Sequence, residues 1–287
     1  MDPSGNGCRR DWAFERVRGK ELVDADQQKV TVEANTREEC EAACLQSQSF
    51  ACRSAEFNHQ LSECRISPHN RFSSSEEGVS LSSARFVVDY LENNCIREPR
   101  GFCNLKMHRQ QMALVADNIR FAMSIDECQQ QCFHNEDFIC RAFSYDSLAR
   151  TCAMSHHTLQ TPPDGTFARS NTNDLIEIST CFDVFVNCEP NMMKAKVVTN
   201  SFFNGKIYAK EKPKSCVLDV SQSLEFTLPI LLAGSDCGTV NEEEGKFSNV
   251  LVIQSNDYVV TSQDKAVGVQ CSYDVGNKTG ETQVNVT

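Results

Sequence analysis

The chain has 287 residues, 28 lysines and arginines against 39 aspartates and glutamates, and a formal net charge of −11 at pH 7. Because nucleic-acid binding requires a basic face, this acidic balance argues against a nucleic-acid partner. The length predicts roughly two domains, and a hydrophobic share of 40% predicts small cores that need cross-links. The 16 cysteines, an even number, predict disulfides formed in an oxidising compartment.

The sequence shows neither a signal peptide nor a membrane span. Residues 1–5 lack a basic start, and polar residues 8–11 follow where the apolar part of a signal peptide would run. The longest apolar stretch, Leu228–Ala233, is far shorter than the roughly 20 residues of a membrane-spanning helix. We therefore expect a piece of a larger secreted or membrane-anchored precursor, or an isoform that lacks both ends.

A repeat of cysteines organises the first two thirds of the chain. Four cysteines are spaced by 4, 8 and 12 residues, and the same spacing returns 88 residues later with matching neighbours, such as Glu39 with Glu127. Each unit also has an outer pair, and six cysteines allow many connectivities. The repeated cysteines are Cys40, Cys44, Cys52 and Cys64, then Cys128, Cys132, Cys140 and Cys152, with outer pairs Cys8 and Cys95, and Cys103 and Cys181.

Each unit is predicted to contain one helix on a small antiparallel sheet. Residues 36–39 (Thr-Arg-Glu-Glu) and 124–127 (Ser-Ile-Asp-Glu) are capping boxes, in which a hydroxyl residue is followed three positions later by Glu. Cysteines four apart then lie on one helix face and can attach the helix to the layer beneath it. The strand-like runs are Ala55–Phe57, Ser83–Tyr90, Ala142–Tyr145 and Leu175–Ile178.

This pattern resembles the PAN/apple domain over residues 8–95 and 103–181. In that family the first cysteine pairs with the sixth, the second with the fifth and the third with the fourth. The resemblance implies the disulfides Cys8–Cys95, Cys40–Cys64, Cys44–Cys52, Cys103–Cys181, Cys128–Cys152 and Cys132–Cys140. The lead-in from Cys8 to Cys40 is seven residues longer than that from Cys103 to Cys128, so an extra loop or hairpin is expected around Val17–Val30.

After Cys181 the composition shifts to lysine and β-branched runs, which predict an all-β sandwich with strands about ten residues apart. The predicted strands are Val197–Thr199, Lys206–Ala209, Leu224–Leu228, Asn249–Ile253, Asp257–Val260 and Ala266–Gln270.

Phe203–Lys210, Gly234–Thr239 and Cys271–Tyr273 resemble the N-terminal half of a zona pellucida (ZP) module over residues 188–275. The resemblance implies an immunoglobulin-like sandwich. Its nested pairing implies Cys188–Cys271 and Cys216–Cys237, so that all 16 cysteines are paired. Residues 276–287 are interpreted as the polar tail of a truncated module, with glycosylation sequons at Asn277 and Asn285.

We predict no catalytic residue and no cofactor-binding or metal-binding residue. An even number of paired cysteines leaves no free, activated thiol, and neither a Gly-x-Ser-x-Gly motif nor a Walker-type loop is present. His156-His157 is the one histidine pair in the sequence. Because neighbours on a strand point to opposite sides, a surface loop is favoured there over a metal site.

Two groups of basic residues are candidates for binding. The first could bind sulfated glycan, although a solvated surface is favoured for it; it contains Arg9, Arg10, Arg16, Arg18 and Lys20. In the second group, lysines on exposed strand edges would discourage indiscriminate edge pairing, and an acidic partner is the weaker alternative. This group contains Lys194, Lys196, Lys206, Lys210, Lys212 and Lys214.

The two resemblances together imply a non-enzymatic extracellular protein. PAN/apple units bind protein or carbohydrate, ZP modules form filaments, and their combination is similar to the cuticle-type apical matrix proteins of moulting animals. We expect a structural matrix component, made as a membrane-anchored parent, whose partners are matrix proteins, glycans and other ZP proteins. A cell-surface adhesin or receptor ectodomain is the alternative, and the regulatory arm of a protease is a remote one. Filaments are expected only with the second half of the module.

Overall fold

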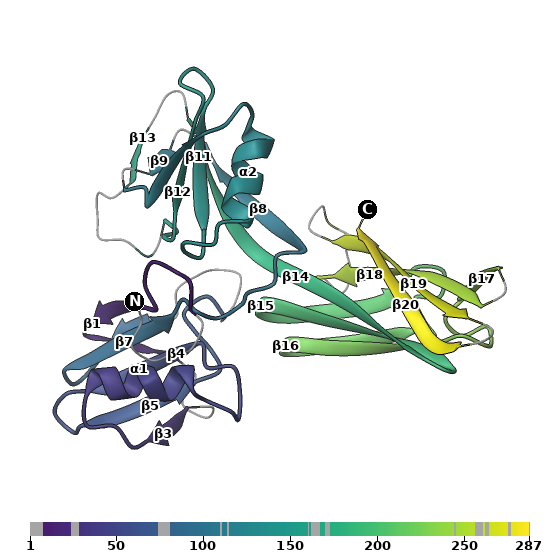
Figure 1. Ribbon diagram of the computed structural model, residues 1–287, viewed down its shortest axis with the longest axis horizontal. Helices are drawn as coiled ribbons and strands as arrows, with labels where there is room; N and C mark the ends of the chain where they lie inside the picture. The colour runs from purple at the N-terminus through teal and green to yellow at the C-terminus, as the bar shows by residue number, and fades with distance from the viewer. Residues whose placement is uncertain are drawn as a thin grey trace. The chain divides into compact units, whose positions relative to one another are not determined.

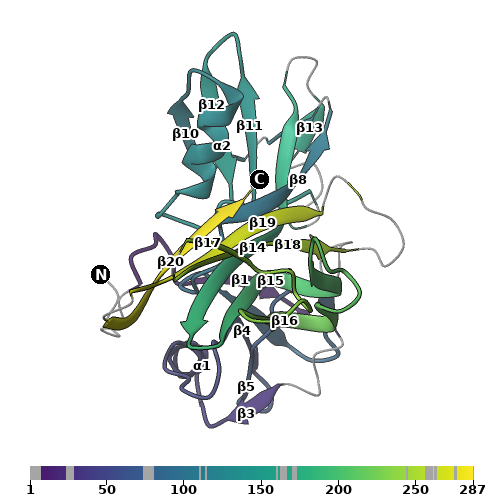
Figure 2. The ribbon, with the colours of Figure 1, turned by 90° about the vertical axis from the view of Figure 1, so that its right-hand side faces the viewer.

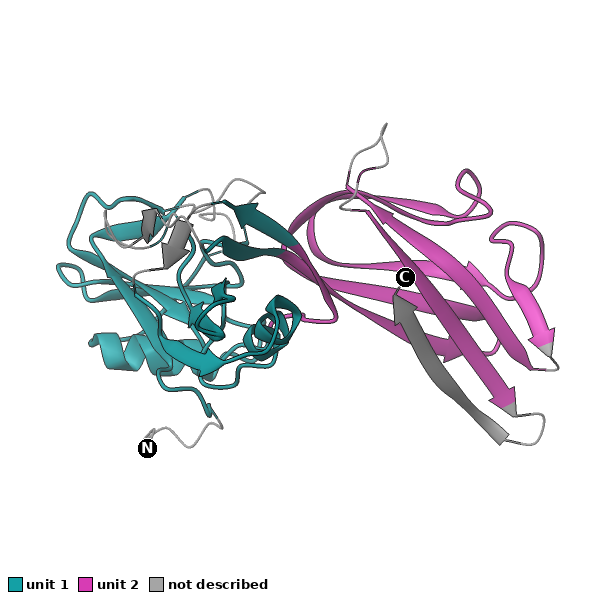
Figure 3. Cartoon of the chain, turned by 90° about the horizontal axis from the view of Figure 1, so that it is seen from above, with its two compact units in different colours: residues 1–97, 105–179 teal, residues 98–104, 180–287 magenta. Residues whose placement is uncertain are grey.

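The computed structural model describes residues 8–23, 29–73, 81–109, 111–113, 115–159, 161, 167–169, 173–243, 245–255, 261, 264–274 and 277–286. The chain divides into two compact units, residues 1–97 with 105–179 and residues 98–104 with 180–287 (Figure 3). Unit 1 holds both cysteine repeats except the outer pair Cys103–Cys181, which lies in unit 2 with the β-rich region. Two strands contribute residues to both units, β8 (Phe102–His108) and β14 (Leu175–Glu189).

The first repeat packs helix α1 (Arg37–Leu45) on a five-stranded antiparallel sheet of order β1-β7-β4-β5-β3 (Figure 1). Its strands are β1 (Phe14–Arg18), β3 (Val30–Val32), β4 (Ser54–Asn58), β5 (Glu63–Ser67) and β7 (Val88–Asn93). The central strand β4 is buried along its whole length. The extra residues around Val17–Val30 do not close a local hairpin, because they supply β2 (Lys20–Leu22), which pairs with the distant β6 (Leu81–Ser83).

The second repeat repeats this arrangement with helix α2 (Ile125–Phe133) and the strand order β10-β12-β11-β14. Its strands are β10 (Asn118–Phe121), β11 (Ala142–Asp146), β12 (Thr151–Ser155) and the start of β14, with β9 (Gln111–Ala113) paired to β13 (Phe167–Arg169). Three of the four predicted strand runs are confirmed. The run Ser83–Tyr90 is wrong as one strand, because β6 and β7 belong to different sheets and the chain must turn between them.

Both helices begin at the predicted capping boxes. The hydroxyls of Thr36 and Ser124 accept hydrogen bonds from the backbone N–H of Glu39 and Glu127, each at 3.1 Å. Each of these carboxylates in turn accepts from the residue before the cap, at 2.7 Å in both helices. The two cysteines of each helix are buried against the sheet, as their spacing of four predicts.

Eight disulfides cross-link the chain, and every cysteine, all of them within the described residues, is paired. The pairs are Cys8–Cys95, Cys40–Cys64, Cys44–Cys52, Cys103–Cys181, Cys128–Cys152, Cys132–Cys140, Cys188–Cys271 and Cys216–Cys237. No pair joins the first repeat to the second, so each repeat has its own set of cross-links.

Unit 2 is a β-sandwich built around two long strands, β15 (Met192–Ala209) and β16 (Val217–Leu231), which pair with each other. The first half of β15 also pairs with β14, and its second half pairs with β18 (Lys246–Gln254). From β18 the sheet continues to β19 (Lys265–Asp274) and β20 (Asn277–Val286), while β17 (Val240–Glu243) pairs with the start of β18 (Figure 2). The core includes Phe203, Ile207, Leu228, Ile230, Leu251, Val267 and Val269.

One expectation for this region is wrong. Val197–Thr199 and Lys206–Ala209 are not separate strands but parts of β15, whose pairing with β16 shifts register between Val198 and Gly205. This irregularity hides the continuity of the strand from sequence patterns. Within the segment interpreted as a polar tail, Asn277–Val286 forms β20 on the edge of β19, a strand that the interpretation did not include. The predicted strand Asp257–Val260 lies outside the described residues.

Candidate functional site

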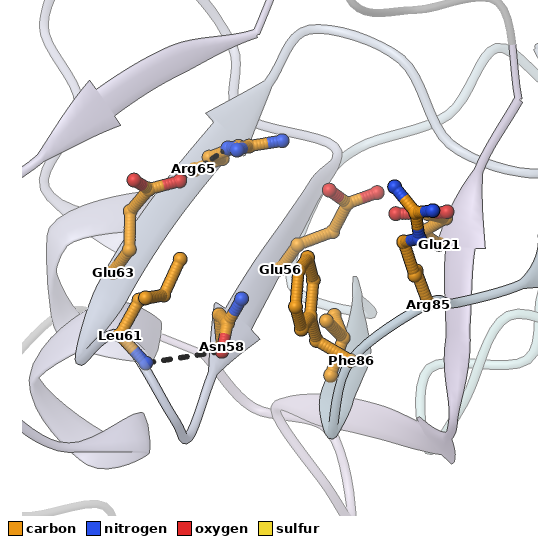
Figure 4. A pocket seen from close by; sticks show the side chains of 9 residues that line it. Glu21, Glu56, Asn58, Leu61, Glu63, Arg65, Arg85 and Phe86 are labelled. Carbon is orange, nitrogen blue, oxygen red and sulfur yellow. Dashed lines mark hydrogen bonds and ion pairs between the residues drawn. The ribbon is translucent and has the colours of Figure 1, made fainter.

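A pocket on the first repeat is the main candidate for ligand binding (Figure 4). It is a hollow of about 130 Å³ between β2, the strands β4 and β5, and the residues that lead into β7. Because strand side chains alternate, Glu56 and Asn58 of β4 face the same side, as do Glu63 and Arg65 of β5. The lining residues are Glu21, Glu56, Asn58, Leu61, Glu63, Arg65, Arg85, Phe86 and Val88.

Glu56 is the most buried carboxylate of the pocket, with 5% of its surface exposed. Its carboxylate accepts from the backbone N–H of Leu22 at 2.6 Å and from the ammonium of Lys29 at 3.0 Å. Burial raises the pKa of Glu56, and these two partners offset part of that effect. The partners therefore fix the carboxylate in place at the pocket wall.

The rest of the pocket combines planar polar groups with apolar surface. Arg65 pairs with Glu63 at 2.5 Å, and the side-chain oxygen of Asn58 accepts from the backbone of the following turn. Figure 4 shows the amide nitrogen of Asn58 directed toward the pocket. Phe86 and Leu61 are 49% and 60% exposed at the rim. Ligand sites typically pair apolar surface with a few placed polar groups, and this volume suits one unit of a ligand.

The second repeat does not carry these side chains. Strands β11 and β12 correspond to β4 and β5 at the offset of 88 residues. At the five positions that match Glu56, Asn58, Leu61, Glu63 and Arg65, the second repeat has Ser144, Asp146, Ala149, Thr151 and Ala153. The ion pair and the buried carboxylate of the first repeat are therefore not repeated.

The two repeats meet within unit 1 at a group of aromatic and charged side chains, which we call the repeat junction. It comprises Trp12, Glu15, Arg71, Phe72 and Glu92 from the first repeat, and Phe138, Arg141, His156 and His157 from the second. The Trp12 ring stacks on Phe138 at 5.8 Å and meets the edge of His156 at 5.1 Å. The backbone N–H of Asp11 donates to the carbonyl of Asp137 at 2.8 Å.

Buried charges form the other half of the repeat junction. Arg71, 1% exposed, pairs with Glu15 and with Glu92, the latter at 3.0 Å. Arg141 lies 3.6 Å from Glu92 and 3.6 Å from the centre of the Phe72 ring. Sequence reasoning missed this network, because arginine and glutamate are rarely buried unless they are paired, and pairing across repeats leaves no local pattern.

His156 and His157 lie in a loop, as the sequence favours, but their rings are not on opposite sides of a strand. Strand β12 ends at Ser155, so the alternation of side chains does not extend to these residues. Their ring centres lie 3.8 Å apart, and both rings are half-buried in the repeat junction. The structure therefore brings together two histidines that a strand would have separated.

Of the first basic group, Arg9, Arg16 and Arg18 are exposed, whereas Arg10 and Lys20 are half-buried. Arg16 pairs with Asp89 at 2.5 Å, and Asp89 also contacts His59 at 2.6 Å. Lys20 donates to the hydroxyl of Ser83 at 3.2 Å. These two residues therefore hold strands together within the first repeat.

The lysines of unit 2 do not guard a strand edge as expected. Lys194, Lys196 and Lys206 lie on β15, which has partner strands on both sides. Lys194 pairs with Glu189 at 2.7 Å, and Lys196 pairs with Glu225 at 2.6 Å. The remaining three lysines lie in the turn between β15 and β16.

Among the described strands, β16 pairs only with β15, and β20 pairs only with β19. Their outer edges present backbone groups that can pair with another chain. Pro229 removes one donor from β16, which shortens the usable part of that edge. Neither helix of the described residues is long and apolar enough to cross a membrane.

Comparison with known proteins identifies the domains. Residues 8–95 and 103–181 match the PAN domain family, and residues 183–273 match the cuticlin N-terminal domain family. Protein let-653 of Caenorhabditis elegans is 32% identical over 100 residues, which are 35% of this chain and 12% of that protein. The chain thus spans only a small part of this relative's length.

Among solved structures, the two N-terminal apple domains of Toxoplasma gondii microneme protein 4 are similar at 13% identity, with a TM-score of 0.21. That match covers 56% of this chain and 84% of the other. The PAN matches alone cover more than half of the residues. The chain therefore belongs to the PAN domain family and carries two PAN domains followed by a cuticlin N-terminal domain.

Proposed function

We propose that this protein is a non-enzymatic component of a cuticle-type extracellular matrix. In this proposal the first PAN domain binds a matrix ligand, and the cuticlin N-terminal domain joins the protein to other chains. Eight disulfides support an oxidising, extracellular setting. The single observation that carries the binding role is the pocket of the first PAN domain.

The chemistry of the pocket favours a glycan unit as ligand. Carboxylate, amide and guanidinium groups can each hydrogen-bond two neighbouring hydroxyls, and a sugar presents such hydroxyls in pairs. The exposed Phe86 ring offers a flat apolar surface for the C–H face of the same sugar. The small volume accommodates one sugar unit and leaves the rest of the glycan outside.

Binding to a panel of immobilised matrix glycans tests this role with the whole 287-residue chain. We expect saturable binding that Phe86→Ala weakens about tenfold, which is about 1.4 kcal/mol of binding free energy. Leu148→Ala is the matched control, because Leu148 is an apolar side chain of the second PAN domain with 86% of its surface exposed. Equal loss in both variants, or none in either, would contradict a role for the pocket.

The joining role is assigned to the outer edge of β16. Residues alternate along an antiparallel strand between those that bond the neighbour and those that face outward. Pro229 has no N–H to donate to β15, so we infer that its backbone nitrogen faces outward. Thr227 is two residues away on the same strand, so its N–H is inferred to face outward as well. Thr227→Pro should therefore block the outer edge and preserve the sandwich.

Sedimentation velocity measures the joining role. We expect wild-type protein to form small oligomers as its concentration rises, Thr227→Val to behave alike, and Thr227→Pro to stay monomeric. Oligomers that persist in Thr227→Pro would rule out this edge. For the alternative of an adhesin, fractionation of cells that secrete the tagged protein is decisive, since recovery with membranes and not with the insoluble matrix would favour it.

A further inference from the structure

We propose that Glu15, His156 and His157 form a zinc site that joins the two PAN domains. Each residue offers one donor atom, and the three atoms lie within 4.8 Å of one another. Glu15 lies on β1 of the first PAN domain, and the two histidines follow β12 of the second. This inference is independent of the proposed glycan binding and of the joining edge.

The hydrogen bonds around the histidines leave the correct nitrogens available. The Nδ1 atom of His156 lies 2.7 Å from Oδ2 of Asp117, and that of His157 lies 3.1 Å from the Thr161 hydroxyl. Metal-binding histidines typically donate one ring N–H to such an oxygen, which fixes the ring and leaves the other nitrogen for the metal. In both rings that other nitrogen is Nε2.

The spacing of the donors suits a small cation. The Nε2 atom of His156 lies 3.9 Å from Oε2 of Glu15. Bonds of 2.0–2.2 Å in a tetrahedral zinc site place two ligand atoms about 3.4 Å apart, so small side-chain rotations complete the geometry. Two imidazoles and one carboxylate suit zinc better than magnesium or calcium, which prefer oxygen ligands alone.

Arg71 is the group that most opposes a cation here, because its guanidinium pairs with Glu15. Glu92 also pairs with the guanidinium of Arg71 and lies near Arg141. The positive charge of Arg71 is therefore shared between Glu15 and Glu92. The carboxylates of Glu15, Glu92 and Asp117 outnumber the guanidiniums of Arg71 and Arg141 by one.

Zinc titration by calorimetry, using the whole chain and Zn²⁺ alone as the probe, tests the site. We expect one zinc per chain, and His156→Gln and His157→Gln should each weaken binding at least tenfold. Asp117→Asn should weaken it about 10–100-fold, because that carboxylate orients His156. His59→Gln is the matched control, since His59 also contacts an aspartate, Asp89, at 2.6 Å but lies outside the site.

Cobalt absorption and near-ultraviolet circular dichroism together distinguish the loss of a metal ligand from the misfolding of a variant. Co²⁺ should give a visible spectrum of low-coordinate geometry in wild type, and each histidine variant should lose it while keeping the wild-type circular dichroism. Glu15→Gln is less informative, because it also removes a partner of the buried Arg71. Absence of saturable zinc binding, or binding that survives in His156→Gln/His157→Gln, would overturn the proposal.

Discussion

In the first PAN domain, β4 and β5 present Glu56, Asn58 and the Glu63–Arg65 pair to a pocket, whereas β11 and β12 of the second present shorter side chains. The helix, its cap and the cysteine pairs are the same in both. We call the helix, its cap and the cysteine pairs the frame of a PAN domain. The frame is therefore independent of the side chains that line the pocket. A repeat can keep its fold through cysteines and caps while the exposed strand positions change.

The same position also differs in its surroundings between the repeats. Phe50 and Phe138 match at the offset of 88 residues, but Phe50 is partly exposed while Phe138 is 1% exposed beneath Trp12. The second PAN domain thus uses at the repeat junction a residue that the first leaves near its surface. The two copies of one frame therefore differ both in the side chains around β4 and β11 and in the residues that they place at the repeat junction.

The largest expected effect is the loss of the shared frame on reduction. Each disulfide should stabilise its domain by about 2–4 kcal/mol, and three in each PAN domain with a small core should decide whether it folds. Reduction should therefore unfold both PAN domains, as measured by circular dichroism. Thiol titration and peptide mapping of the unreduced protein should find no free thiol. A reactive cysteine, or a disulfide between the two PAN domains, would contradict the shared frame.

The next largest effect is a difference in stability between variants of Glu92 and Glu177. These two glutamates occupy matching positions on β7 and β14. Glu92→Gln leaves the buried Arg71 and Arg141 without their shared carboxylate and should destabilise the fold by about 3–5 kcal/mol. Glu177→Gln should cost less, because the partners of Glu177 are the ring of His108 and the backbone N–H of Leu159 and not buried guanidiniums. Urea unfolding measures both variants. Equal destabilisation would mean that the network at the repeat junction adds nothing.

A smaller and equal effect is expected at the two helix caps. Thr36→Ala and Ser124→Ala should each cost about 1 kcal/mol, since each removes the hydroxyl that accepts the N–H of the third helical residue. Thermal unfolding monitored by circular dichroism measures the change. Unchanged stability in either variant would mean that the cap of that helix does not stabilise its domain, in contradiction to the expected equivalence of the two helices.

The smallest effect concerns pH and His157 of the second PAN domain. The pKa of His157 is lowered in the fold by burial, so the unfolded chain binds this proton more readily than the folded one. Stability should therefore fall as the pH drops below about 6.5, the usual histidine value. His157→Gln, compared with wild type in the presence of a chelator between pH 7.5 and 5, should reduce this dependence. An identical pH dependence in both proteins would contradict the burial of His157.

Local patterns predicted the helices and their caps, and the resemblance to the PAN/apple domain implied the cysteine pairs. The capping boxes specify where α1 and α2 begin, because a cap depends on residues three positions apart. The pocket was not predictable, since Glu56, Arg65 and Phe86 come from different segments and meet only when the sheet forms. The length of β15 was missed for a related reason: its register shift at Val198–Gly205 is set by pairing with β16 and not by the residues themselves.

Hydrogen–deuterium exchange of the whole chain with and without a bound matrix glycan tests the central proposal, that the two PAN domains share a frame and that the ligand binds at the pocket of the first. We predict slower exchange on binding in β4 and β5 (Ser54–Asn58 and Glu63–Ser67), and no change in β11 and β12 (Ala142–Asp146 and Thr151–Ser155). Protection confined to β11 and β12, or equal in both domains, would contradict the account.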